Sequence, residues 1–164
     1  MNSNTLKKVI AIDPSRHNIE QICKNFGVRP IPDSNIKVPY APIEIDIDNI
    51  GFAHLCKPDE FIISHFLRRS RLSERNDLIP LDASVGLAIL DYQKEGKDIP
   101  KLWNQELNYN RRRIFFDNSL FINSQSQSCI IFMYQTDSGI YTLDLCNLDE
   151  KPSRVCFSAI INLN

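Results

Sequence analysis

Glycine is scarce in this sequence: only five of the 164 residues are glycine. Phosphate-binding loops need closely spaced glycines because their backbone approaches the phosphate oxygens, and neither standard glycine spacing occurs here. The Gly-x-Ser-x-Gly pattern around the nucleophile of many serine hydrolases is also missing. The sequence therefore lacks the usual signatures of nucleotide chemistry and of serine hydrolysis.

The sequence also lacks an excess of charge of either sign and any long hydrophobic run. It has 19 basic and 20 acidic residues and a net charge of −1, so a nucleic acid or an anionic membrane would need a local patch. No apolar run has the length of a membrane span. The residues after Lys7 and Lys8 do not resemble a signal peptide. We expect a cytoplasmic protein with no membrane partner.

Cysteine and histidine occur without the spacing of a metal site or a redox pair. The five cysteines form no Cys-x-x-Cys pair, and their odd number and wide spacing within apolar runs indicate free thiols in a reducing compartment. His54 and Cys56 lie two residues apart, but no second pair completes four metal donors. His65 is expected on a helix as a half-buried packing residue. We predict no cofactor, no metal and no catalytic residue.

What the sequence does contain is the composition of a globular domain, with 43% hydrophobic and 24% charged residues. A chain of this length can bury a core without disulfides, and we expect a single domain over residues 1–164. Residues 128–164 carry the strongest pattern. Segments 129–134, 140–146 and 154–161 are rich in β-branched and aromatic residues and are separated by turn residues. They predict a C-terminal three-stranded antiparallel meander.

Helical patterning occupies the part of the chain before the meander. Asp13-Pro14 predicts the start of a first helix, in which Asp13 accepts backbone N–H groups and Pro14 fits the first turn. The residues Ile19, Ile22, Cys23 and Phe26 then recur with helical spacing, and Gly27 follows as a cap. A second helix is predicted from Pro58, with a buried stripe of Ile63, Phe66 and Leu67.

A third helix is predicted from the N-cap Asp82 to about Glu95, packed centrally against the meander, and a short fourth helix over 99–107. Four prolines make residues 28–42 an irregular segment. The sequence thus predicts an α+β domain in which two to four helices pack on an antiparallel sheet.

An acidic row follows the proline-rich segment. In residues 43–48, isoleucines alternate with Glu44, Asp46 and Asp48, which predicts a strand with three carboxylates on its outer side. One interpretation is an edge strand protected by charge. The other is a surface for a basic partner or a cation.

Two arginine clusters are the alternative candidate sites. Arg68, Arg69 and Arg71 lie near the end of the second predicted helix, where basic side chains suit the helix dipole or an anionic ligand. Arg111, Arg112 and Arg113 precede a strand and lie close to Tyr109, Phe115 and Phe116. Proteins bind single-stranded nucleic acid with basic side chains mixed with aromatic rings, so this cluster could be such a site. The alternative interpretation is that these arginines are the solvated start of a strand.

Two short segments resemble parts of known families. Residues 9–14, Val-Ile-Ala-Ile-Asp-Pro, resemble the first strand of the RuvC resolvase and ribonuclease H-like families, where the aspartate at the strand end binds paired metal ions. Helical patterning begins here where those families continue with a hairpin. Residues 138–144 resemble a late strand pair of the SUKH-type immunity domains, whose early tryptophan and Gly-Gly features this sequence lacks. Neither resemblance assigns the chain to a family.

Two classes of function follow from these patterns. The first is a small protein-binding module of immunity or antitoxin type, which neutralises a toxin such as a nuclease by covering its active surface. Glu44, Asp46 and Asp48 would bind the basic surface of that partner. The second is a nucleic-acid or phosphate-ligand binding protein, or an enzyme, that uses the arginine clusters. The sequence favours the first class and a protein that is not an enzyme.

Overall fold

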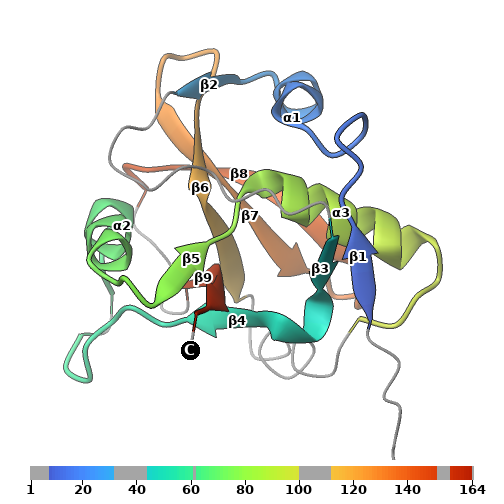
Figure 1. The fold of residues 1–164 in the computed structure, drawn as a ribbon. Helices are drawn as coiled ribbons and strands as arrows, with labels where there is room; N and C mark the ends of the chain where they lie inside the picture. The colour runs from blue at the N-terminus through green and yellow to red at the C-terminus, as the bar shows by residue number, and fades with distance from the viewer. Residues whose placement is uncertain (1–7, 32–43, 61, 100–111, 151–155, 164) are drawn as a thin grey trace, which may run out of the picture.

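The computed structural model describes residues 8–31, 44–60, 62–99, 112–150 and 156–163 (Figure 1). These ranges contain three α-helices, one 3-10 helix and nine strands. In chain order the elements are β1 (Val9–Ala11), α1 (Ile19–Phe26), β2 (Arg29–Ile31), β3 (Glu44–Asp46), η1 (Ile47–Asn49), β4 (Ile50–Ala53), α2 (His65–Ser73), β5 (Leu78–Pro80), α3 (Ala83–Lys94), β6 (Arg113–Ile122), β7 (Ser128–Gln135), β8 (Tyr141–Asn147) and β9 (Cys156–Asn162).

Seven strands form one mixed sheet, while β1 and β3 form a separate two-stranded sheet. The main path runs β4-β9-β6-β7-β8, with β2 paired to the second half of β6 and β5 paired to the end of β9. The pair β6 and β9 is parallel, and the other pairs are antiparallel. The predicted α+β class, with helices packed on a mostly antiparallel sheet, is confirmed.

The meander contains different strands from those predicted. Strands β7 and β8 pair as expected around a turn in which Gly139 has a φ of 80°. The third strand of the meander is β6, whereas β9 lies on the opposite side of β6 and pairs with β4, β5 and β6. Apolar patterning identifies β9 as a strand, but it does not specify which neighbour supplies the hydrogen bonds.

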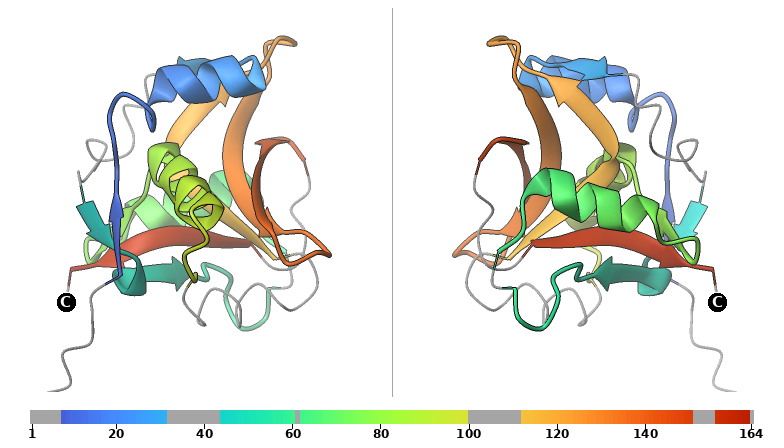
Figure 2. Two further views of the ribbon diagram at one scale, coloured as in Figure 1. Left: turned by 90° about the vertical axis from the view of Figure 1, so that its right-hand side faces the viewer. Right: turned by 90° about the vertical axis from the view of Figure 1, so that its left-hand side faces the viewer.

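Helix α3 crosses one face of the sheet (Figures 1 and 2). Its N-cap is Asp82, whose carboxylate accepts a hydrogen bond from the backbone N–H of Ser84 at 2.8 Å. All residues from Ala83 to Ile89 are buried, and the helix contacts β1, β6, β7 and β8. The prediction of a central helix that packs on the sheet is confirmed.

Helix α1 ends as predicted but begins later. Gly27 closes it in the left-handed conformation, with a φ of 64°. The N-cap is Asn18 rather than Asp13, whose side chain instead accepts a hydrogen bond from the Ser15 N–H. Asp13 therefore closes a separate turn before the helix.

The proline-rich segment contributes one strand to the described structure. Within the predicted irregular range 28–42, residues Arg29–Ile31 form β2, and 32–42 lie outside the described residues. Pro30 is tolerated because β2 has β6 as its one described neighbour, so one side of β2 needs no N–H donor. Of the predicted fourth helix over 99–107, residues 100–107 also lie outside the described residues.

Helix α2 lies on the opposite side of the molecule from β1 and β3 (Figure 1). It begins at His65 after the N-cap Ser64, not at Pro58 as predicted. Its buried residues are His65, Arg68, Arg69 and Leu72. Phe66 and Leu67 are 56% and 40% exposed, so the prediction that they form the buried stripe is wrong. The polar face of α2 packs on the sheet because the sheet supplies polar partners there.

Candidate functional site

The predicted acidic row lies on the small sheet and on the 3-10 helix that follows it, with Glu44 and Asp46 in β3 and Asp48 in η1. We call Glu44, Asp46 and Asp48 the acidic edge. Glu44 and Asp48 are exposed and Asp46 is half-buried, while Ile45 and Ile47 between them are buried. The prediction of one strand that carries all three carboxylates is wrong, because β3 ends at Asp46 and Asp48 lies in η1. There the Asp46 carboxylate accepts a hydrogen bond from the Asp48 N–H at 3.1 Å and caps η1.

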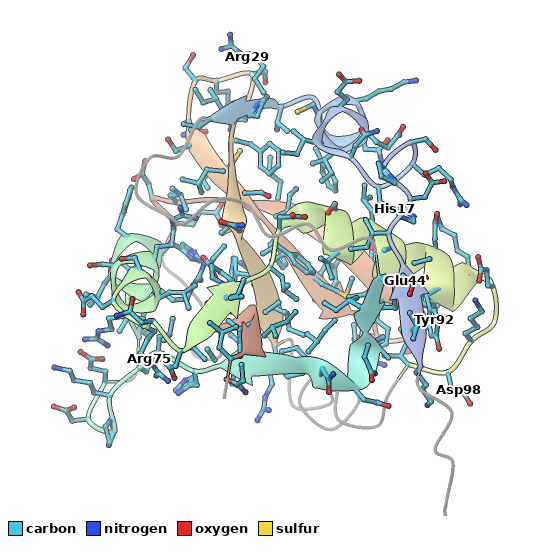
Figure 3. All side chains as sticks on the ribbon, viewed as in Figure 1. His17, Arg29, Glu44, Arg75, Tyr92 and Asp98 are labelled. Atoms are coloured by element: carbon cyan, nitrogen blue, oxygen red, sulfur yellow. The ribbon has the colours of Figure 1, made fainter. Side chains whose placement is uncertain are left out.

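Within the described ranges, no lysine, arginine or histidine lies at ion-pair distance from any carboxylate of the acidic edge. Figure 3 shows Glu44 on the β1–β3 side of the molecule and Arg75, which follows α2, on the other side. The negative charge of the acidic edge is therefore not neutralised by described basic residues.

The arginines of α2 point into the protein rather than into solvent. Arg68 is 1% exposed, and its Nη2 donates to the Asp117 carboxylate at 2.7 Å. Arg69 is 8% exposed and donates to the backbone carbonyl of Asp117. The guanidinium of Arg68 also stacks on the Phe115 ring, with its Cζ 3.9 Å from the ring centroid. These two guanidinium groups are thus occupied by groups of the same chain.

Asp117 lies where the sheet divides, which explains why two arginines converge on it. The β6–β7 register shifts between Phe115 and Leu120, and the partner of β6 changes from β9 to β2 across the same stretch. A strand carbonyl at such a break loses its regular partner and needs another donor in the interior. Arg69 supplies that donor, and Arg68 neutralises the buried carboxylate.

The hydrogen bonds fix the tautomer of His65. Arg68 Nη1 lies 2.8 Å from His65 Nδ1, and because a guanidinium only donates, Nδ1 accepts and the proton is on Nε2. Nε2 lies 3.4 Å from Cys146 Sγ, to which it donates. Burial, followed by the charge of Arg68, lowers the pKa of His65 to about 4. The fully buried imidazole is therefore neutral at pH 7, and His65 was predicted to be only half-buried.

Cys146 connects this buried cluster to the surface. Its Sγ donates to the Glu150 carboxylate at 3.5 Å, and Arg113 Nη1 lies 3.9 Å from the same sulfur. A hydrogen-bonded series thus runs from Asp117 through Arg68, His65 and Cys146 to Glu150. Since Nε2 of His65 carries its proton, the imidazole cannot accept a proton from Cys146, so this arrangement is not an activated Cys-His pair.

The remaining candidate arginines occupy different places. Arg71 makes two hydrogen bonds to the Glu60 carboxylate, and these hydrogen bonds lower the pKa of Glu60 to about 2. Arg112 lies over the Phe157 ring at 5.5 Å and Arg113 over the Phe132 ring at 4.6 Å. Arg111 lies outside the described residues. The structure therefore does not bring the two predicted arginine clusters together as one anion-binding surface among the residues it describes.

Asp117 is the residue that sequence reasoning missed. It is a charged residue inside the strand Arg113–Ile122, directly after the apolar run Ile114, Phe115 and Phe116. An acidic residue within such a strand must have a buried partner, and basic residues on a helix are the natural source. That signal points to Asp117, but it does not identify Arg68 as the partner, 49 residues earlier in the chain.

No group of three or more metal-ligating side chains occurs among the described residues. No described helix is both long enough and apolar enough to cross a membrane. Comparison of the chain with protein-family models, with curated proteins and with solved structures finds no significant match.

Proposed function

We propose that this chain is a small protein-binding module that docks a basic protein surface on the acidic edge. The observation that carries this proposal is the pairing of charges in the described structure. Arg16, Arg68, Arg71 and Arg75 each have a carboxylate partner, whereas Glu44, Asp46 and Asp48 have no basic partner in the described ranges. Carboxylates concentrated at one edge attract a basic protein and select it over acidic ones.

The partner that we propose is a toxin whose working surface is basic, and the bound module would neutralise it by covering that surface. A nuclease is the simplest example, because the carboxylates of the acidic edge would occupy the positions that substrate phosphates take. Electrostatic attraction of this kind acts mainly on the rate of association, which then falls as salt screens the charges.

Affinity capture from native lysate tests the proposal with three forms of the full chain as bait. The first is unmodified, and the second carries Glu44→Gln, Asp46→Asn and Asp48→Asn. Asparagine at position 46 keeps the oxygen that caps η1. The third is a matched control with Glu20→Gln, Asp59→Asn and Asp98→Asn, which removes the same charge from exposed positions elsewhere.

We expect the unmodified chain and the control to retain the same basic protein at low salt, and the acidic-edge variant to lose it. A retained protein with toxin activity that the module suppresses would support neutralisation, and a retained partner without such activity would remove the toxin from the proposal. Equal retention by all three baits, or retention of no basic protein, would overturn docking at the acidic edge.

A further inference from the structure

A hollow of about 410 Å³ opens on the face of strands β6, β7 and β8 that also carries α2. Its volume lies within the range of pockets that hold small molecules, roughly 300–1,000 Å³. Phe132 and Tyr134 of β7 supply aromatic surface, with their ring centroids 5.7 Å apart. The hollow is separate from the acidic edge, because neither β3 nor η1 contributes to its lining.

The hollow contains one cation that lacks a carboxylate partner. Arg113 is half-buried, and its guanidinium is stacked 4.6 Å from the Phe132 centroid. In the described part of the chain its polar contact is the one to Cys146 Sγ at 3.9 Å, and no carboxylate lies at ion-pair distance. A stacked guanidinium is held in one orientation, so it can meet a carboxylate with two parallel hydrogen bonds.

Two carboxylates line the same hollow. Asp144 lies on β8 and Asp137 in the β7–β8 turn, and both are exposed. Neither forms an ion pair with Arg113 or with another basic residue in the ranges that the structure describes. Opposite charges thus line one small hollow without neutralising each other.

We propose that this hollow binds a small zwitterion of the free α-amino acid type. The ligand carboxylate would bind Arg113, its ammonium group would bind Asp137 and Asp144, and its side chain would lie on the aromatic surface. A ligand with only negative charge would be repelled by the two aspartates, and one with only positive charge by Arg113. A zwitterion satisfies both signs, and an ammonium beside an aromatic ring gains cation–π attraction.

Isothermal titration of the full chain with individual protein amino acids tests this site. L-phenylalanine is compared with N-acetyl-L-phenylalanine, which lacks the ammonium group, and with L-phenylalaninamide, which lacks the carboxylate. We expect at least one free amino acid to bind, and Arg113→Gln and Asp144→Asn each to weaken that binding about tenfold or more. If phenylalanine is the amino acid that binds, its two derivatives should bind about tenfold or more weakly than phenylalanine itself.

Arg29→Gln and Asp98→Asn, at exposed positions away from the hollow, serve as controls and should leave the affinity unchanged. Asp144 is exposed, so its variant keeps the test valid if Arg113→Gln fails to fold. No heat with any amino acid at roughly millimolar concentration would overturn the proposal. Binding that is insensitive to Arg113→Gln and Asp144→Asn would overturn it too, as would equal affinity for either single-charge derivative.

Discussion

At the scale of single residues, the buried pair of Arg68 and Asp117 determines how α2 sits on the sheet. Arg68 reaches Asp117, His65 and the Phe115 ring together, so its guanidinium can occupy only one position. Desolvating two charges is costly, and it is offset by their mutual attraction and by the bond from Arg68 to His65, whereas Arg68 Nε and Asp117 Oδ2 are buried without a partner in the described structure. We expect such a pair to contribute specificity of packing more than net stability.

Removing one member of this pair should therefore cost more than replacing both. Asp117→Asn should lower the free energy of unfolding by about 3–5 kcal/mol, because Arg68 then keeps an unpaired charge in the interior. The double variant Arg68→Met with Asp117→Leu should lose less, since no buried charge remains. Urea unfolding followed by circular dichroism measures both values. A double variant that loses as much as the two single variants combined would contradict this explanation.

His65 should make stability depend on pH. The folded state protonates His65 only below about pH 4, whereas the unfolded chain protonates it near pH 6.5. The contribution of neutral His65 is thus complete above pH 6.5, and it should fall by roughly 3 kcal/mol as the pH decreases from 6.5 to 4. His65→Gln should remove this component, giving a flatter profile in urea unfolding across that range. If the stability of the unmodified chain and that of the His65→Gln variant changed in parallel with pH, His65 would be protonated equally in the folded and unfolded states.

At the scale of elements, α2 buries a different face from the apolar one that its sequence pattern predicts. Its described outer face presents Phe66 and Leu67, and its inner face presents charged residues with Leu72. Phe66→Ser and Leu67→Gln should each change the free energy of unfolding by less than about 0.5 kcal/mol, as exposed substitutions do. Leu72→Ala should cost about 2–5 kcal/mol because it leaves a cavity. Thermal and urea unfolding measure these changes in the free energy of unfolding. A larger loss for Phe66→Ser than for Leu72→Ala would contradict the prediction.

The packing of α3 on the sheet depends on a helical glycine. A Cβ at Gly86 would lie 2.8 Å from a Phe116 ring atom and 3.0 Å from a Leu143 methyl group. Alanine favours helix by about 1 kcal/mol over glycine, so propensity alone predicts that Gly86→Ala stabilises the chain. We expect the opposite sign, a loss of about 1–3 kcal/mol from overpacking, in urea unfolding. A stabilised variant would show that α3 can move away from the sheet.

The sequence predicts those elements whose local signals agree with their surroundings. Helix α3 has a capping aspartate and apolar residues on most of its circumference, and it forms as predicted. The buried face of α2 is predicted wrongly because Arg68 of the helix pairs with Asp117, 49 residues later in the chain, and helical periodicity cannot reveal that partner. The predicted pairing of β9 with β8 is wrong for a related reason, because the hydrogen-bond partners of a strand depend on the packing of the whole molecule. The acidic edge is visible in the sequence, but the hollow at Arg113 is not, because three strand segments form it only after folding.

At the scale of the whole molecule, the two proposed sites lie on different parts of a molecule whose net charge is only −1. The acidic edge lies on β3 and η1, and the hollow lies on the α2 face of the main sheet. Local segregation of charge, rather than the total, would then determine what binds. The two sites share no residue, so the acidic-edge variant should retain amino-acid binding, and Arg113→Gln should retain the captured protein.

The salt dependence of association with the captured partner tests whether a basic protein docks on the acidic edge, as we claim. The association rate should fall steeply between low and physiological salt for the unmodified chain and for the Glu20, Asp59 and Asp98 control. For Glu44→Gln with Asp46→Asn and Asp48→Asn, the rate should be lower at low salt and its salt dependence flatter. The same rates and the same salt dependence in all three chains would contradict the claim.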